Sequence, residues 1–244
     1  MKPGNQFLFL PLGGLGEIGM NLALYGYDKA WIMVDCGITF GDDTTPGIDV
    51  MVPDPTFALE NASNLVGIVL THAHEDHLGA IPYLWRKLRC PVYATPFTAN
   101  FLRQKLSETG LENEVPIKIV DPGSCFSLGP FEMEFIPVTH SIPETQALAI
   151  TNKLGTVLHA SDWKLDPSPL VGPLTNRSRL RRVGKKKLIA LMCDSTNIFV
   201  EKKERSEGAL RKSLFQIVDG CKNQVAVTCF ASNVARLETC FRAA

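Results

Sequence analysis

The chain consists of short apolar runs separated by glycine, proline and aspartate. Runs of this length, rich in β-branched and aromatic residues and bounded by turn-forming residues, predict β-strands. The predicted strands are 7–12, 21–27, 30–35, 65–71, 91–95, 116–120, 131–138, 147–151, 156–160, 188–193 and 224–230. Longer segments with helix start and stop signals predict helices at 78–88, 96–109 and 207–218. The pattern therefore predicts a strand-rich α/β protein.

Polar clusters stand just beyond the carboxyl ends of several predicted strands. In α/β sheets, ligands gather outside this end of the strands. We therefore expect these clusters to share one rim of the molecule. The residues concerned are His72, His140, Asp162, Asp194, Ser232 and Asn233.

The first of these clusters carries the strongest chemical signal. Three of the five histidines of the chain, His72, His74 and His77, lie in one short segment together with Asp76. His72 and His74 can turn toward one ion, whereas the adjacent pair Asp76 and His77 favours a second ion close by. A solvated polar loop would explain one or two of these histidines, but not all three.

Two downstream residues fit the same site. His140 would complete three histidines around the first ion, and Asp162 suits a carboxylate that bridges both ions. Imidazole and carboxylate ligands favour zinc, with manganese as the alternative. Two such ions polarise a phosphoryl or carbonyl group and generate hydroxide at neutral pH, which predicts a hydrolase.

Two further residues near these segments have open roles. Asp35, at the end of a predicted strand, is either an acceptor for the N–H of a ligand histidine or an ordinary turn residue. His159 lies within an apolar run and is predicted to be a core histidine.

Two other motifs are given less weight. The pattern Gly14-x-Gly16-x-x-Gly19 imitates a dinucleotide fingerprint, but an alternating strand pattern follows it rather than a helix, so a hairpin turn is expected. The segment 177–187 holds seven basic residues in eleven. It is interpreted as a solvated connector, with a phosphate-attracting lip beside the site as the alternative.

Composition changes this picture little. The chain is 45% apolar and 20% charged, as is ordinary for a globular protein, and Lys plus Arg equals Asp plus Glu at 25 each. Net charge therefore predicts no nucleic-acid partner. The seven cysteines form no C-x-x-C pair, which favours a reducing cytoplasm. The apolar run at 7–12 is too short for a signal peptide or a membrane helix.

The motif His72-x-His74-x-Asp76-His77, with His140 and Asp162 downstream, resembles the metallo-β-lactamase superfamily. More specific strings resemble bacterial ribonuclease J, a nuclease of the β-CASP family, along essentially the whole chain. These strings are Gly13–Gly19, His140–Pro143, Ser161–Lys164, Cys193–Asn197 and Phe230–Asn233 with Arg236.

The resemblance implies an αββα metallo-β-lactamase fold, here incomplete, over residues 1–205, followed by the beginning of a β-CASP domain at 206–244. It implies two zinc ions, with Asp76, His77 and Asp162 as catalytic residues. The substrate implied is single-stranded RNA with a 5′-monophosphate, cleaved by 5′ exonuclease and endonuclease action. It also implies a cytoplasmic enzyme that forms homo-oligomers and binds no membrane.

Other positions match family motifs whose roles are less specific. Asp194, Ser232, Asn233 and Arg236 match positions near the RNA path, and Gly47 and Asp49 match positions that the family uses for a structural calcium ion. The chain departs from the family in having no histidine from Asn176 onward, where a further ligand of the second metal is expected. We therefore expect an N-terminal fragment with a weak second metal site and poor activity alone.

Three alternatives to an RNA-cleaving enzyme stay open. One is a small-molecule hydrolase of the same fold, such as a thioesterase or lactonase. Another is a non-catalytic module that binds RNA or a partner protein. The third is a β-CASP nuclease that acts on DNA.

Overall fold

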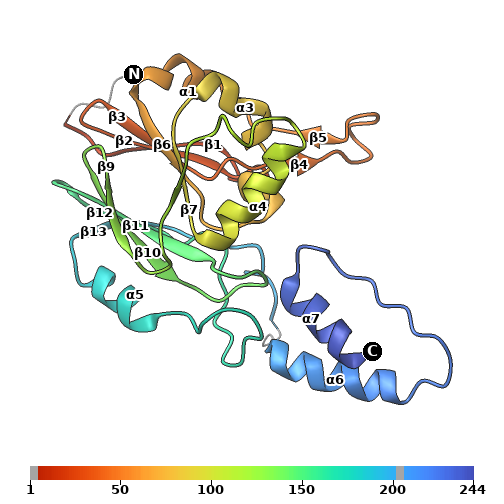
Figure 1. The fold of residues 1–244 in the computed structure, drawn as a ribbon. Helices are drawn as coiled ribbons and strands as arrows, with labels where there is room; N and C mark the ends of the chain where they lie inside the picture. The colour runs from red at the N-terminus through yellow and green to blue at the C-terminus, as the bar shows by residue number, and fades with distance from the viewer. Residues whose placement is uncertain (1–4, 202–205) are drawn as a thin grey trace.

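Two β-sheets face each other in the computed structural model, which describes residues 5–201 and 206–244 (Figure 1). The first sheet has six strands in the order β1-β2-β3-β6-β7-β8. β1, β2 and β3 pair antiparallel, and β3, β6, β7 and β8 pair parallel. The strands are Leu8–Gly13 (β1), Leu22–Tyr27 (β2), Ala30–Val34 (β3), Leu65–Val69 (β6), Val92–Ala94 (β7) and Ile117–Ile119 (β8).

The second sheet has five strands in the order β13-β12-β11-β10-β9. All neighbours are antiparallel except β12 and β13, which run parallel. The strands are Cys125–Leu128 (β9), Phe131–Pro137 (β10), Gln146–Asn152 (β11), Gly155–His159 (β12) and Leu188–Met192 (β13). A separate small hairpin pairs Thr39–Phe40 (β4) with Val50–Met51 (β5).

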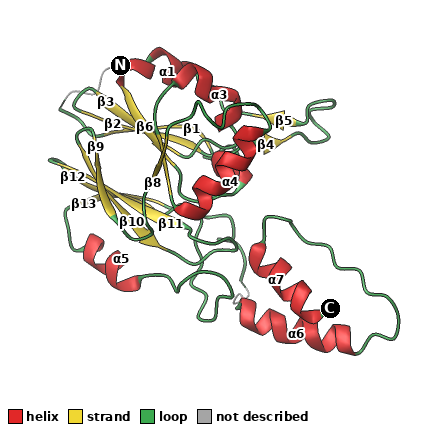
Figure 2. Ribbon diagram, in the orientation of Figure 1, coloured by secondary structure: helices red, strands yellow, loops and turns green. Residues whose placement is uncertain are grey.

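Helices cover the outer faces of both sheets (Figure 2). α1, α3 and α4 lie on the side of the first sheet, and α5 lies below the second. The order of layers is thus helix, sheet, sheet, helix, and the predicted αββα fold is confirmed. The helices are Thr56–Glu60 (α1), Ala62–Asn64 (a 3₁₀ turn, η1), Glu75–Leu78 (α2), Ile81–Leu88 (α3), Pro96–Ser107 (α4), Arg177–Gly184 (α5), Glu207–Asp219 (α6) and Val234–Ala243 (α7).

Three apolar clusters hold these layers together. The largest joins the first sheet to its helices and includes Ile68, Ile81 and Leu102, all fully buried. The second fills the space between the sheets and includes Phe131 and Phe135. The third, smaller cluster lies under α5, where Val183 packs against the second sheet. Burial on both faces explains why the inner strands of each sheet, such as β2 and β11, read as near-continuous apolar runs.

Most predicted elements are confirmed to within a few residues, and the glycine-rich segment does connect two antiparallel strands. Two predictions are wrong. Residues 224–230 form no strand, and no described strand pairs with them. Val225 and Val227 line a cavity together with Leu214 and Val218 of α6. A strand needs partners for its backbone N–H and C=O groups, and this segment is exposed along its length without a described strand beside it.

The basic segment 177–187 is also not a connector over its first part. It forms α5, whose first turn is capped because the side chain of Asn176 accepts a hydrogen bond from the backbone N–H of Arg179. Arg179 and Arg182 both pair with Glu134 of β10, so part of the positive charge is neutralised against the sheet.

The two last helices lie apart from the sheets, packed against each other (Figure 1). The domain boundary predicted at residue 205 falls at 202–205, outside the described residues. Among the described helices, none is long and apolar enough to cross a membrane. All seven cysteines are free thiols.

Candidate metal centre

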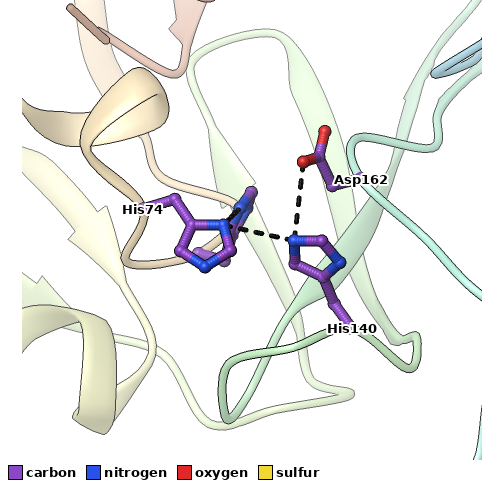
Figure 3. Close-up of side chains that lie close together, drawn as sticks. His74, His140 and Asp162 are labelled. Atoms are coloured by element: carbon purple, nitrogen blue, oxygen red, sulfur yellow. Dashed lines mark hydrogen bonds and ion pairs between the residues drawn. The ribbon is translucent and has the colours of Figure 1, made fainter. Parts of the chain in front are cut away.

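The predicted ligands come from loops at the ends of strands in both sheets. The segment from His72 to His77 follows β6 of the first sheet and includes the short helix α2. His140 and Asp162 follow β10 and β12 of the second sheet. Because these strand ends face the same side of the sandwich, side chains distant in sequence meet there (Figure 3).

Four of these side chains form one group, with a potential ligand atom from each lying within 4.8 Å of the others: His72, His74, His140 and Asp162. His74 Nδ1 lies 3.0 Å from His72 Nε2 and 3.2 Å from His140 Nε2. His140 Nε2 in turn lies 3.5 Å from Asp162 Oδ2. Three imidazole nitrogens and one carboxylate oxygen thus converge on one point.

A second group consists of Asp76, His77 and Asp162. His77 Nε2 lies 3.5 Å from Asp76 Oδ2 and 3.5 Å from Asp162 Oδ1. Asp162 therefore turns one carboxylate oxygen to each group. The structure brings together all six residues that the sequence predicted as ligands.

These spacings suit a tetrahedral divalent ion. With metal–nitrogen distances of about 2.0–2.1 Å, neighbouring ligand atoms of tetrahedral zinc lie about 3.3–3.4 Å apart. The separations of 3.0, 3.2 and 3.5 Å in the first group lie close to that value. The donor set and its geometry thus fit a divalent metal site.

Asp35 orients one histidine in each group. Its Oδ2 accepts a hydrogen bond of 2.7 Å from His77 Nδ1, which leaves Nε2 of His77 facing Asp76 and Asp162. The carboxylate of Asp35 also accepts hydrogen bonds from Thr71. The hydroxyl of Thr71 lies 2.9 and 3.0 Å from the two carboxylate oxygens, and its backbone N–H donates to Oδ1 at 2.8 Å. One buried carboxylate is therefore held by two neighbours of the site.

Thr71 extends this hydrogen-bond network to His72 and Ser161. With its proton donated to Asp35, its oxygen can accept from His72 Nδ1 at 3.0 Å and from the hydroxyl of Ser161 at 2.8 Å. His72 then presents the lone pair of Nε2 to the point on which the ligand atoms of the first group converge. Partners beyond the ligands commonly fix the tautomer of a metal-binding histidine in this way.

Two residues of this network have left-handed backbone conformations. Asp35 has φ of 60° and Ser161 has φ of 54°. Residues other than glycine rarely adopt such values, and the conformation costs about 1–3 kcal/mol unless surrounding contacts impose it. The hydrogen bonds of both side chains to Thr71 supply such contacts.

The electrostatics of the two groups differ. Burial lowers the pKa of His72 well below its usual value, and burial lowers the pKa of His140 to about 4. Burial also disfavours charged His77, but the charge of Asp35 and hydrogen bonds to Asp162, Asp35 and Asp76 prevail, so the pKa of His77 is raised well above its usual value. The first group thus offers neutral imidazoles, whereas the carboxylates around His77 favour the positively charged form of that residue.

Other residues predicted from the sequence lie around this centre. Asp194 and Asn233 line a cavity of about 710 Å³ together with His140 and Asp162. The carbonyl oxygen of Ser232 lies 3.4 Å from His74 Nε2. Arg236, by contrast, pairs with Glu207 at 3.4 Å, and the side chain of Asn233 caps α7.

Two of the weaker assignments lie away from the centre. Gly47 and Asp49 are in the exposed loop between β4 and β5. His159, which was predicted to be a core histidine, is partly buried. Its Nδ1 lies 2.9 Å from the hydroxyl of Tyr25, which packs between the sheets.

Sequence reasoning missed three residues that contact the ligands or their hydrogen-bond partners. Thr71 and Ser161 precede ligands directly, but a hydroxyl next to a histidine or aspartate carries no signal of its own. The Nδ2 of Asn21 lies 3.1 Å from the carbonyl oxygen of Asp76 and 3.2 Å from His77 Nε2. The only hint for Asn21 is its position directly after the glycine-rich turn.

The sequence of this chain is similar to the beta-lactamase superfamily and to ribonuclease J. Residues 30–178 match the family model described as the beta-lactamase superfamily domain. Ribonuclease J of Sinorhizobium meliloti is 47% identical over 100% of this chain and 44% of its own length. Ribonuclease J of Helicobacter pylori (strain 26695) is 36% identical over 93% of this chain and 33% of its own length.

The chain thus spans less than half the length of these relatives, as expected from its departure from the family pattern. Among solved structures, a protein of unknown function from Enterococcus faecalis V583 aligns with a TM-score of 0.66 at 20% identity, covering 97% of this chain and 63% of that chain. This likeness supports the fold.

Proposed function

We propose, from the premise that this chain belongs to the beta-lactamase superfamily and resembles ribonuclease J along its whole length, that it is the metal-binding part of an RNA-hydrolysing enzyme. The observation that carries the proposal is the pair of ligand groups that share Asp162. Paired metal ions held a short distance apart are the usual apparatus for in-line displacement at phosphorus.

In this proposal His72, His74, His140 and Asp162 hold one ion, and Asp76, His77 and Asp162 hold the other. Nitrogen-rich ligand sets favour zinc, and manganese is the alternative. The second group has fewer ligands, so we expect weaker binding there. When bound, the two ions would lower the pKa of water and stabilise the attacking and leaving oxygens of a phosphodiester.

The side chains of the protein supply orientation. Asp162 sets the spacing of the two positions because each of its oxygens faces one group. Asp35 holds His77 directly and, through Thr71, fixes His72. We assign the catalytic residues Asp76, His77 and Asp162 on this basis, since they surround the position at which a phosphate would meet both groups.

The remaining assignments are part of the same proposal. RNA is the proposed substrate because the relatives are named ribonuclease J, and a 5′-monophosphate on it is proposed from the resemblance alone. Residues 206–244 are proposed to begin a β-CASP domain, with Asp194, Ser232 and Asn233 near the RNA path. A calcium ion at Gly47 and Asp49, assembly into homo-oligomers and a cytoplasmic location are proposed from the resemblance alone.

The test is cleavage of a 5′-monophosphorylated RNA by the purified chain with zinc or manganese, with metal content measured by elemental mass spectrometry. We expect slow, metal-dependent shortening of RNA that His74→Ala abolishes together with metal binding. His159→Gln is the matched control, because this histidine belongs to neither ligand group.

The alternatives give different results in the same assay. Turnover of a simple thioester or lactone without any cleavage of RNA would show a small-molecule hydrolase. Equal cleavage of single-stranded DNA would show a nuclease without RNA preference. RNA binding by a metal-loaded chain that cleaves none of these substrates would leave a binding module.

A further inference from the structure

One wall of the cavity beside the metal centre is formed by large apolar side chains. Trp163, which directly follows Asp162, is 38% exposed, and Leu165 and Ile198 are 47% and 71% exposed. All three line the cavity of about 710 Å³ that also contains His140 and Asp162. Exposed apolar side chains gathered at one cavity are typical of a binding site.

The indole ring of Trp163 is held in place at one edge. Its Nε1–H donates to Cys193 Sγ at 3.2 Å, and Cys193 donates to the carbonyl oxygen of Asp194 at 3.3 Å. The polar atom of the ring is therefore engaged, and the rest of its exposed surface is an aromatic hydrocarbon. A fixed aromatic ring loses little entropy when a flat ligand stacks on it.

The charge of the lining argues against an anionic ligand in this part of the cavity. Asp166, Asp194 and Glu207 line it, and Lys164, the only Lys or Arg among the described lining residues, lies 3.8 Å from Glu207. A phosphate would be repelled here and would be drawn to the metal centre. An uncharged planar group, with amides and hydroxyls to accept and donate hydrogen bonds, fits better. The lining residues of that kind include Ser195, Thr196, Asn197 and Asn233.

We propose that Trp163 forms a stacking platform for one nucleobase of single-stranded RNA, next to the phosphate at the metal centre. The inference rests on the proposed function and adds a base-binding subsite to it. The position is suitable because Trp163 directly follows Asp162 in the chain, and both residues line the same cavity. Stacking tolerates all bases, so the subsite would favour an unpaired base rather than a particular sequence.

The experiment compares RNA binding by Trp163→Leu and Trp163→Phe. The probe is a 5′-monophosphorylated adenylate decamer with a fluorescent 3′ label, read by anisotropy in the first seconds with zinc bound. Since loss of a base–aromatic stack costs about 1–3 kcal/mol, Trp163→Leu should weaken binding by about 5- to 150-fold. Trp163→Phe keeps an aromatic face and should stay within about threefold of the unmodified chain. Tyr83→Leu on α3, 58% exposed and outside the cavity, is the control.

A second arm locates the base. Each copy of the decamer carries one abasic nucleotide at a different position. One copy should bind the unmodified chain as weakly as the intact decamer binds Trp163→Leu. The same copy should bind Trp163→Leu no more weakly than the intact decamer does. Trp163 is also the only exposed tryptophan of three, since Trp31 and Trp85 are 2% and 4% exposed. Its fluorescence should therefore be quenched by the intact decamer and not by that abasic copy.

Equal affinity of Trp163→Leu and the unmodified chain, at equal metal content, would overturn the stacking proposal and leave the proposed function standing. An abasic penalty that is the same in both proteins would overturn it as well. A metal-loaded chain that binds no RNA at all would instead refute the proposed function, and the subsite with it.

Discussion

Replacement of Thr71 by valine removes one hydroxyl from a fully buried position and keeps the branched shape of the side chain. The hydroxyl has three partners, Asp35, His72 and Ser161, at 2.8–3.0 Å. In the valine variant the N–H of His72 and the hydroxyl of Ser161 lose their acceptor. A buried polar group without a partner costs about 1–3 kcal/mol.

Two donors are affected, and Ser161 is buried but keeps 7% of its surface exposed, so water can recover part of its cost. We expect the metal-free variant to lose about 2–4 kcal/mol of unfolding free energy. We also expect zinc affinity at the first position to fall by about 10- to 100-fold, because His72 is then free to adopt either tautomer. Thr71→Ser keeps the hydroxyl and should retain the affinity, while losing about 1 kcal/mol of packing.

The assay has three readouts on these two variants. Competition with a chromophoric chelator gives zinc affinity, urea unfolding of the metal-free chain gives stability, and long-range ¹⁵N–¹H spectra report which ring nitrogen of His72 carries the proton. Zinc affinity of Thr71→Val within about threefold of the unmodified chain would refute the reasoning, since that is below the loss expected for such a partner. A serine variant as weak as the valine variant would show that the methyl group, not the hydroxyl, matters.

Two further perturbations test the shared geometry. Asp162→Asn should reduce zinc at both positions, because each carboxylate oxygen faces one group; elemental analysis that finds a full complement of zinc would contradict the sharing. Gly37→Ala should displace the segment that carries Asp76 and His77, because a Cβ at Gly37 would lie 1.7 Å from the backbone oxygen of Asp76. We expect weaker zinc binding at the second position and a lower Tm, and an unchanged chelator titration would show that this segment moves without consequence.

The sequence predicted the six candidate ligands, but not the hydroxyl hydrogen bonds that orient them. His72, His74 and His77 are so close together that no structural role explains them jointly, and the ends of strands are visible in the apolar pattern. The hydroxyl network could not be predicted, because Thr71 and Ser161 look like ordinary polar residues until Asp35 is placed beside them.

Each error in the predicted fold has its own physical origin. Residues 224–230 alternate as a strand would, but they remain exposed with no described strand beside them, and period alone does not supply a partner. The helix α5 was missed because its sequence is dominated by basic residues. Few of its residues, such as Leu180 and Val183, are apolar and pack against the sheet. The strand β9 was also missed, since four residues beginning with exposed Cys125 carry little apolar signal.

The position of the ligands at the ends of strands from both sheets has a mechanical consequence. An ion bound by His72 and His74 from the first sheet and by His140 and Asp162 from the second would cross-link the two halves of the sandwich at one edge. Separation of the sheets would then require release of the ion, so metal binding and folding become linked equilibria. Resistance to heat would rise with the logarithm of free metal concentration, by RT ln(1 + [M]/Kd). A bound ion would thus stabilise the fold in addition to serving the chemistry.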